Sequence, residues 1–503
     1  MSLTSLPSAI TSFLCNMSPG LILACVGIYT LLIFAVTYFT SRNADNKSFF
    51  IGNRSSRWYV VAYGMIGASL SGVTFLSVPG DVGKGGFAYF QMVLGYLLGY
   101  FVIAFVLLPL YYRLNLTSIY SYLKERLGIY SYKTGAAFFI LSRTIGASFR
   151  LFIVVNVLQK FVFDAWGVPF AVTTAIFILL IIAYTFKGGV KTIVWTDSLQ
   201  TTFMLLSLLL SVVLICRQLN FGFGDMVSAI KNSAYSTLVV TDWHVKTFFL
   251  KHFFGGMFIA IAMTGLDQEM MQKNISCKNI GEAKKNVITF SIVLVFVNFI
   301  FLCLGALLYI YIETKGISIP ERTTDDLFPA IALQHLGTLS GLFFIIGLIS
   351  AAYPSADGAL TALTASFCID FLGFESRKEL TEERKTSLRK IVHISFAGIL
   401  LLMILLFWLT NDEAVIRKLF KFANYTYGPL LGLFFFGILT KRNIIDKLVP
   451  FVCLIAPLIC YFLDLYSKEL FNGYLFGNEL LILNGLLTFV GLILCTDKRI
   501  RTT

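Results

Sequence analysis

Charged residues are scarce in this chain of 503 residues. Asp, Glu, Lys and Arg together make up 13% of the sequence, whereas soluble domains carry about 25%. Apolar residues account for 57%, and apolar stretches near the roughly 20 residues that cross a bilayer as a helix recur along the chain. A soluble core does not explain them, because such cores stop growing near about 250–300 residues. The composition predicts an all-α polytopic membrane protein.

Motifs of enzyme chemistry are also missing. The four histidines form no HExxH pattern and no paired metal spacing, and no P-loop is present to bind ATP. The nine cysteines include no CxxC pair, and most lie in apolar runs, which indicates buried and inert thiols. We therefore expect neither an enzyme nor a primary active transporter formed by this chain alone.

The apolar pattern predicts a single membrane domain over residues 1–503 with about thirteen spans. An odd number of spans places the two termini on opposite sides of the membrane. The predicted spans lie near residues 20–41, 59–80, 87–112, 134–162, 168–186, 191–216, 248–272, 288–312, 341–369, 391–410, 417–440, 447–466 and 479–496.

Basic residues separate to one side of these spans. The net charge of +13 would suggest nucleic acid in a soluble protein, but here it is spread through short loops beside a lipid bilayer. Lysine and arginine gather in alternate loops. These include the loop at 370–390 and the loop that we expect to begin at Lys273, after the span near 248–272. Because positive loops stay in the cytoplasm, we expect a plasma (inner) membrane protein with its N-terminus outside and its C-terminus cytoplasmic. The charge-dense 370–390 segment is expected to be a solvated amphipathic helix.

Small and hydroxyl-bearing residues interrupt the second span. The stretch from Gly67 to Thr74 reads GASLSGVT, and Pro79 and Gly80 follow it. Such residues let a transmembrane helix unwind, and the freed carbonyls then bind a cation. Close packing against a neighbouring helix explains the same composition, and the two interpretations are evenly matched on this stretch alone.

Polar residues also interrupt the span near 341–369. Pro354 has no N–H group, so the carbonyl of Ser350 loses its helical partner. Ala351 and Ser355 share one helical face, and Asp357 adds a full charge inside the span. A free carbonyl, hydroxyls and a carboxylate are hard oxygen ligands, which favours a cation site over a simple kink.

Three further charged residues stand out within spans. Asp197, in the tetrapeptide WTDS, is either functional or a helix N-terminal acid that complements the macrodipole. Arg143 and Arg150 are seven residues apart and share one helical face. Arginine in a bilayer has to pair or snorkel, and a charge at this depth usually marks a function.

Several motifs resemble those of the sodium:solute symporter family, which includes proline, sugar, sialic acid and iodide carriers. They are GGVKTIVWTDSLQ at 188–200, DQEMMQK at 267–273, YTYGPLLG at 425–432 and FFFGILTKR at 434–442. The resemblance runs from about residue 20 to 496. It implies a 5+5 inverted-repeat core with discontinuous helices. The repeats would cover 59–216 and 248–440, with a leading helix at 20–41 and two trailing helices at 447–496.

The resemblance also implies a coupling ion, Na⁺, and where it binds. The common sodium site would use the carbonyls of Gly67 and Leu70, the carbonyl of Ala351 and the hydroxyl of Ser355. The second hydroxyl position of the family is Pro354 here, which weakens the expectation. A second sodium site, present in some members, would use Asp197. The two hydroxyl positions beside it read Asp357 and Gly358 in this chain.

For the solute, the sialic acid carriers resemble this chain at Ser69, Ser71, Thr74, Phe87 and Gln91, and they have an arginine near the position of Arg143. The positions where sugar carriers keep an asparagine and a gating tyrosine look like Ala260 and Met263, which argues against a neutral sugar. Arg143 suggests an anion, although a structural arginine explains it equally well.

The leading hypothesis is therefore a sodium-coupled secondary symporter. It would import a small polar organic solute, such as a sugar acid or other carboxylate, by alternating access. The alternative is a membrane sensor or receptor on a degenerate transporter scaffold, which the altered sodium positions keep open. A channel is the third possibility, but no repeated selectivity filter is visible.

Overall fold

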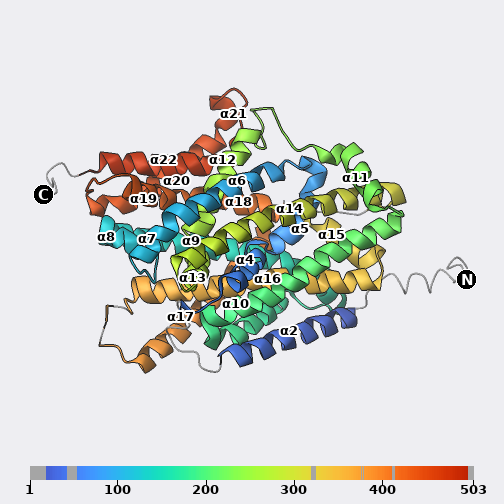
Figure 1. Ribbon diagram of the computed structural model, residues 1–503, viewed down its shortest axis with the longest axis horizontal. Coiled ribbons are helices and arrows are strands. Elements are labelled where there is room, and N and C mark those ends of the chain that lie inside the picture. Colours follow the sequence, from blue (N-terminus) through green and yellow to red (C-terminus); the bar gives the residue numbers. More distant parts are fainter. Residues whose placement is uncertain are drawn as a thin grey trace, which may run out of the picture.

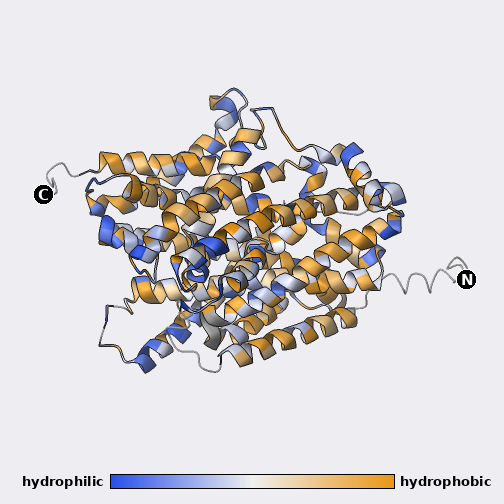
Figure 2. Ribbon diagram, viewed as in Figure 1, coloured by the Kyte–Doolittle hydropathy of each residue, from blue (hydrophilic) through white to orange (hydrophobic). Residues whose placement is uncertain are grey.

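The computed structural model describes residues 19–41, 54–318, 324–374, 376–377, 379–410 and 414–496. Within these ranges the chain is almost entirely helical, and strand pairing is limited to two isolated bridges. The helices lie roughly along the long axis of the molecule and are predominantly apolar along their length (Figures 1 and 2). The all-α membrane fold predicted from composition is confirmed.

The principal helices, in chain order, are α2 (Pro19–Ser41), α4 (Trp58–Ser69), α5 (Gly72–Gly85), α6 (Tyr89–Val102), α7 (Leu108–Arg113), α8 (Ser121–Arg126), α9 (Ile129–Leu158), α10 (Phe170–Leu219), α11 (Phe223–Asn232), α12 (Phe249–Ala260), α13 (Gln268–Ile275), α14 (Ile280–Lys315), α15 (Leu327–Ala330), α16 (Thr338–Ser366), α17 (Glu382–Thr410), α18 (Val415–Thr426), α19 (Gly428–Leu439), α20 (Val449–Leu465), α21 (Ser467–Leu470) and α22 (Leu480–Leu494).

Among the described residues, eight helices are long and apolar enough to cross a membrane, and the number rises to eleven if each of three bent pairs is one span. Two shorter apolar helices, Phe170–Phe186 and Leu480–Leu494, coincide with two further predicted spans. The predicted ranges fall on these elements, but several helices extend further; α17, for example, begins at Glu382 rather than near residue 391. The total of thirteen spans stays a prediction.

Three spans are broken rather than straight. The α4–α5 pair bends by 54°, and its break falls at Leu70 and Ser71, inside the stretch of small residues singled out above. The segment Phe249–Gly265 meets α13 at 67°, and α18 meets α19 at 43°. The broken helix expected near the start of the chain's first half therefore exists, and so does its counterpart in the second half.

Helix α10 consists of two arms that fold back on each other. A straight helix of 50 residues would be about 75 Å long, far more than the roughly 30 Å of a hydrocarbon core. Along α2, the contacts with α10 run in the order Thr40 with Thr192, Phe34 with Tyr184, and Tyr29 with Phe203. Tyr184 precedes Thr192 and Phe203 follows it, yet both contact α2 at residues further back than Thr40. The chain therefore has to reverse its direction before Thr192, which agrees with the two separate spans predicted at 168–186 and 191–216.

The two ends of the bundle hold different loops. Helix α8 and the first turns of α17 lie at the left end in Figure 1, whereas α11 lies at the right end. This arrangement agrees with the predicted alternation of the loops. Of the 370–390 segment, expected to be a solvated amphipathic helix, the part from Glu382 onward is helical and largely exposed, and it forms the first turns of the spanning helix α17.

The broken helix α4–α5 is enclosed by the rest of the bundle. Helix α4 packs against α10, α14 and α16, while α5 packs against α14 and α9. Helices α2, α20 and α22 lie at the edges (Figure 1). Polar groups released by the break are therefore shielded from lipid, which is the condition for irregular backbone at membrane depth.

Candidate solute and cation site

A small cavity of about 80 Å³ lies at the break between α4 and α5. Three of the predicted solute-contacting residues, Ser69, Ser71 and Thr74, line it. The rest of the lining combines hydroxyl groups with apolar side chains such as Met263 and Leu294, and no carboxylate is present among the described lining residues. The cavity therefore suits a small solute that carries both polar and apolar parts.

Arg150 supplies the one positive charge in the lining of this cavity. Its side chain is buried, and two of its guanidinium nitrogens, Nε and one terminal nitrogen, have no hydrogen-bond partner. It forms no ion pair with the described residues. An unpaired buried charge is costly, which makes Arg150 a candidate group for binding an anion.

Arg143, about two turns before Arg150 on the same face of α9, has a different environment. Its guanidinium forms an ion pair with Glu269 and lies 3.8 Å from the carboxylate of Asp267. Both carboxylates belong to the segment at the start of α13, and Arg143 does not line the cavity. The charge of Arg143 is thus satisfied within the chain.

The structure places Phe87 and Gln91 outside the cavity as well. The Gln91 amide nitrogen donates to the carbonyls of Ala88 and Thr247 at 3.0 Å, and its oxygen accepts from the N–H of Val240 at 3.1 Å. Two of these three hydrogen bonds therefore hold the loop that precedes α12. Phe87 packs edge-on against a phenylalanine of α14.

A larger vestibule of about 460 Å³ adjoins the cavity. Tyr89, Ile416 and Phe420 line both spaces and so form the wall between them. The vestibule is also lined by Gly85 and Gly86, at the end of α5, and this end carries α11 in Figure 1. Solute that enters from this end would meet the wall before it reaches Arg150.

The lining of the vestibule is rich in positive charge. Four basic residues, Lys84, Lys246, Arg417 and Lys421, contribute to it. Of these, Arg417 forms an ion pair with Asp81, which ties α18 to α5 across the vestibule. Two carboxylates, Asp81 and Asp464, also line the vestibule, so its lining carries both signs of charge with an excess of positive charge.

The predicted sodium ligands of the broken helix lie at its interruption. No backbone N–H within the described residues donates to the carbonyls of residues 67–70, because the chain leaves the α4 helix there and α5 begins only at Gly72. The N–H of Gly67 donates to the hydroxyl of Thr201 on α10 at 3.1 Å. Free carbonyls at a helix break are suitable ligands for an alkali cation.

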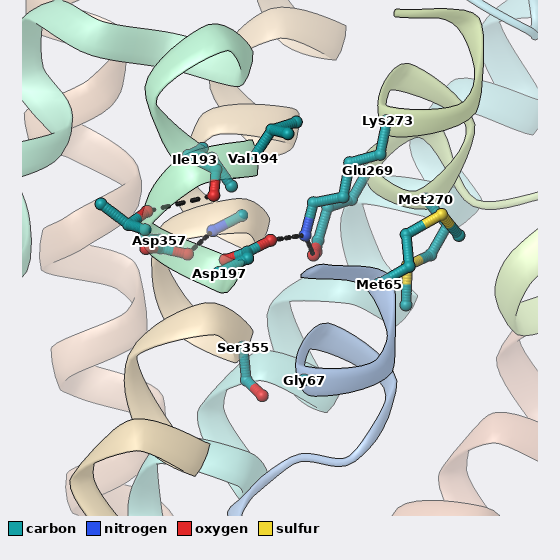
Figure 3. A network of polar contacts seen from close by, with 12 residues as sticks. Met65, Gly67, Ile193, Val194, Asp197, Glu269, Met270, Lys273, Ser355 and Asp357 are labelled. Carbon is teal, nitrogen blue, oxygen red and sulfur yellow. Dashed lines mark hydrogen bonds and ion pairs between the residues drawn. The ribbon is translucent and has the colours of Figure 1, made fainter. Parts of the chain in front are cut away.

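The remaining predicted sodium ligands lie on α16, which packs against α4. Ser355 is fully buried, and its hydroxyl lies 3.5 Å from the carbonyl of Ala351, one turn earlier. Figure 3 shows the Ser355 side chain beside the turn of α4 that carries Gly67. Pro354 lies inside α16 without ending it. A hydroxyl of α16 thus lies beside the turn of α4 that precedes the break.

A second group of charges surrounds Asp197 on α10. Its carboxylate pairs with the ammonium of Lys273 at 2.8 Å, and Lys273 also lies 3.3 Å from Glu269 (Figure 3). Asp357 accepts from the hydroxyl of Tyr184 at 2.9 Å. The prediction that Lys273 belongs to a cytoplasmic loop is wrong, because its side chain is buried on α13.

The matches to known proteins agree with this arrangement. The family model described as "SSF: Sodium:solute symporter family" matches residues 49–444. The chain belongs to the sodium:solute symporter family. The resemblance noted in the sequence is thereby confirmed, and the symporter couples the movement of a solute to sodium.

Relatives of the symporter include sialic acid and monocarboxylate carriers. The sodium/sialic acid symporter SiaT of Proteus mirabilis is 23% identical over 459 residues, which is 90% of each chain. The sodium-coupled monocarboxylate transporter 1 of Xenopus laevis is 27% identical over 441 residues, 83% of the symporter and 66% of that protein.

Two solved structures show the same fold. A sodium-coupled sialic acid symporter in a substrate-bound, outward-open state matches with a TM-score of 0.79 at 19% identity, over 95% of this chain and 99% of that one. The nucleobase-cation-symport-1 transporter Mhp1 matches with a TM-score of 0.52 at 13% identity, over 90% and 94%. The symporter is therefore a multi-pass membrane transporter with this fold.

Two residues of the site were given no such role by the sequence. Arg150 was noted only for sharing a face with Arg143. Lys273 follows Glu269 by four residues, a spacing at which opposite charges meet on a helix. That spacing was a signal for a buried pair, but the position of Lys273 at the end of an apolar run pointed to a loop.

Proposed function

We propose that the symporter imports a small carboxylate together with sodium by alternating access. The observation that carries the proposal is Arg150, a buried guanidinium without an ion-pair partner among the described residues, which lines the cavity at the α4–α5 break. A guanidinium matches the two oxygens of a carboxylate in a bidentate pair. Arg143 is the weaker candidate for this role, because it already holds two carboxylates of its own chain.

The surroundings of Arg150 support a small solute. The cavity measures about 80 Å³, well below the roughly 300–1,000 Å³ of sites for drug-sized ligands. Hydroxyls at Ser71 and Thr74 face apolar groups such as Met263 and Leu294. A short hydroxy- or oxo-acid fits this mixture better than a solute as large as sialic acid, and the basic vestibule would draw it in.

Sodium and solute would meet at the same interruption of the chain. The carbonyls of Gly67 and Leu70 would bind sodium with Ala351 and Ser355. The side chains of Ser69, Ser71 and Thr74 flank the same break and would contact the solute. Gly72, the first residue of α5, packs against the backbone of Arg150. A cation that fixes the break thus also fixes the groups that bind the solute. Sodium would therefore bind the conformation that is ready for solute more tightly than the other conformation of the transport cycle.

The orientation of the symporter belongs to the same proposal. The end with α11 and the vestibule would face outward. The end with α8 and the first turns of α17 would face the cytoplasm, because the basic loops gather there. The N-terminus would then lie outside, the C-terminus inside, and the protein would act in the plasma membrane.

Uptake into proteoliposomes tests the proposal. An inward sodium gradient should drive uptake of radiolabelled lactate, and choline in place of sodium should abolish it. Lactamide, which has the same shape without the charge, should not compete with lactate. Equal uptake in sodium and choline would contradict sodium coupling. Competition by lactamide as strong as that by unlabelled lactate would contradict recognition of the carboxylate.

A further inference from the structure

Asp197 and Lys273 form an ion pair that is sealed from solvent. The ammonium lies 2.8 Å from the Asp197 carboxylate, and both side chains are almost fully buried. The two residues come from different parts of the chain, α10 and the short helix α13, and Figure 3 shows them facing each other. The pair lies where the family resemblance places a second sodium ion.

The other ligands expected for that second ion are engaged or missing. Asp357 accepts from the hydroxyl of Tyr184 and, at 2.5 Å, from the N–H of Gly358. Gly358 offers no hydroxyl, and a Cβ placed there would lie 2.3 Å from a carboxylate oxygen of Glu269. The space of the missing side chain is therefore filled by Glu269, which is itself paired with Lys273 and Arg143.

We propose that Lys273 is a tethered cation that takes the place of the second sodium ion at Asp197, so that the symporter binds a single sodium. This inference rests on the proposed sodium-coupled function and specifies its stoichiometry. An ammonium is a compact point charge with several donors. A sodium ion at Asp197 would have to lie within a few ångströms of the ammonium, where like charges repel strongly at low dielectric.

The pairing of the neighbouring carboxylates agrees with this assignment. Glu269 is held by Lys273 and Arg143, and Asp267 lies near Arg143 and accepts from the hydroxyl of Tyr427 at 3.0 Å. Each carboxylate of the cluster is thus paired with a cation or a hydroxyl of the chain. Asp197 is paired through the charge of Lys273 alone, because neither of its oxygens has a hydrogen-bond partner among the described residues. The carbonyl ligands at the α4–α5 break are left for the one sodium ion.

Binding of radioactive sodium to the purified full chain tests the inference. The unmodified symporter should bind one sodium per chain. Lys273→Met, which removes the charge but keeps much of the length, should bind two, because Asp197 is then free to accept the ion. Lys273→Arg should bind one. Lys315→Met, an exposed lysine at the end of α14, serves as the matched control and should also bind one.

A double variant identifies the second ligand set. Lys273→Met combined with Asp197→Asn should return the count to one, because the carboxylate that would hold the extra ion is gone. Two ions in the unmodified chain, or an unchanged count of one in correctly folded Lys273→Met, would overturn the inference and leave sodium coupling intact. No sodium bound to the unmodified chain would instead overturn the proposed function itself. If Lys273→Met does not fold, the count in the unmodified chain decides alone.

Discussion

Gly358 on α16 leaves the space into which the Glu269 side chain of α13 inserts. A Cβ at position 358 would lie 2.3 Å from one carboxylate oxygen and 2.7 Å from the carboxyl carbon of Glu269. Glu269 has little freedom to withdraw, because Arg143 and Lys273 both hold it. The absence of a side chain on one helix therefore permits the buried charge cluster on another.

Gly358→Ala is expected to destabilise the symporter by about 1–3 kcal/mol, the usual cost of overpacking a closed interior. Its thermal unfolding midpoint in detergent should fall below that of the unmodified protein. Gly398→Ala is the matched control, because a Cβ there meets no atom within 4 Å on the exposed face of α17. Equal midpoints for both variants would show that Glu269 can move aside freely.

Arg150→Ala should weaken solute binding strongly while sodium binding persists. Hydrogen bonds to charged groups contribute about 1.5–3 kcal/mol, so the KM for lactate is expected to rise by about 10- to 100-fold. Arg150→Lys should recover little of this loss, because an ammonium does not reproduce the bidentate geometry. Uptake kinetics alongside sodium binding separate this effect from general damage to the fold.

Arg143→Ala is expected to act on stability instead. It leaves Glu269 and Asp267 without the guanidinium, and breaking a buried ion pair costs about 3–5 kcal/mol. The unfolding midpoint should therefore fall further than in Arg150→Ala. A stable Arg143→Ala protein with a raised KM for lactate would show that Arg143, rather than Arg150, contacts the solute.

The sodium site can be tested at the two neighbouring positions on α16. Ser355→Ala removes the one hydroxyl predicted to bind the ion, so the sodium concentration for half-maximal uptake should rise several-fold. Pro354→Ser restores the hydroxyl that the family resemblance expects and should lower that concentration. The two opposite shifts are measured from the sodium dependence of initial uptake rates. Unaltered sodium dependence in both variants would place the ion elsewhere.

Labelling from outside tests the orientation. In a cysteine-free background, a cysteine at Asn232, at the end of α11, should react with an impermeant thiol reagent. A cysteine at Leu380, before α17, should be protected until the membrane is permeabilised. The reverse pattern would invert the topology without affecting the fold.

Much of the fold could be predicted from the sequence, because apolar runs of bilayer length and small-residue interruptions are local signals. The break after Ser69 and the two arms of α10 follow from such signals. The sequence does not show which arginine lines the cavity, because helical spacing shows only that Arg143 and Arg150 share a face. The two arginines differ because Arg143 alone pairs with Asp267 and Glu269, which lie more than a hundred residues further along the chain.

Gln91 illustrates the same limit in another way. Its position in the resemblance suggested contact with the solute, and nothing in its own neighbourhood argues otherwise. The structure shows its amide bonded to the backbone of the loop before α12, at Val240 and Thr247. A polar residue in a span has to find partners, and the sequence does not show whether those partners are solute or chain.

If Lys273 replaces the second sodium at Asp197, the ion pair limits how far the solute can be concentrated inside the membrane compartment. A lysine charge stays with the protein, so it draws nothing from the transmembrane gradient in a transport cycle. One sodium carried with one monovalent anion moves no net charge, and the membrane voltage then contributes no driving force. A tenfold sodium gradient supplies about 1.4 kcal/mol and supports about tenfold accumulation. A second sodium would add its own gradient and about 2.3 kcal/mol per 100 mV. With one sodium per cycle, the symporter would reach a smaller concentration ratio of solute across the membrane, but it would use fewer sodium ions for each molecule imported.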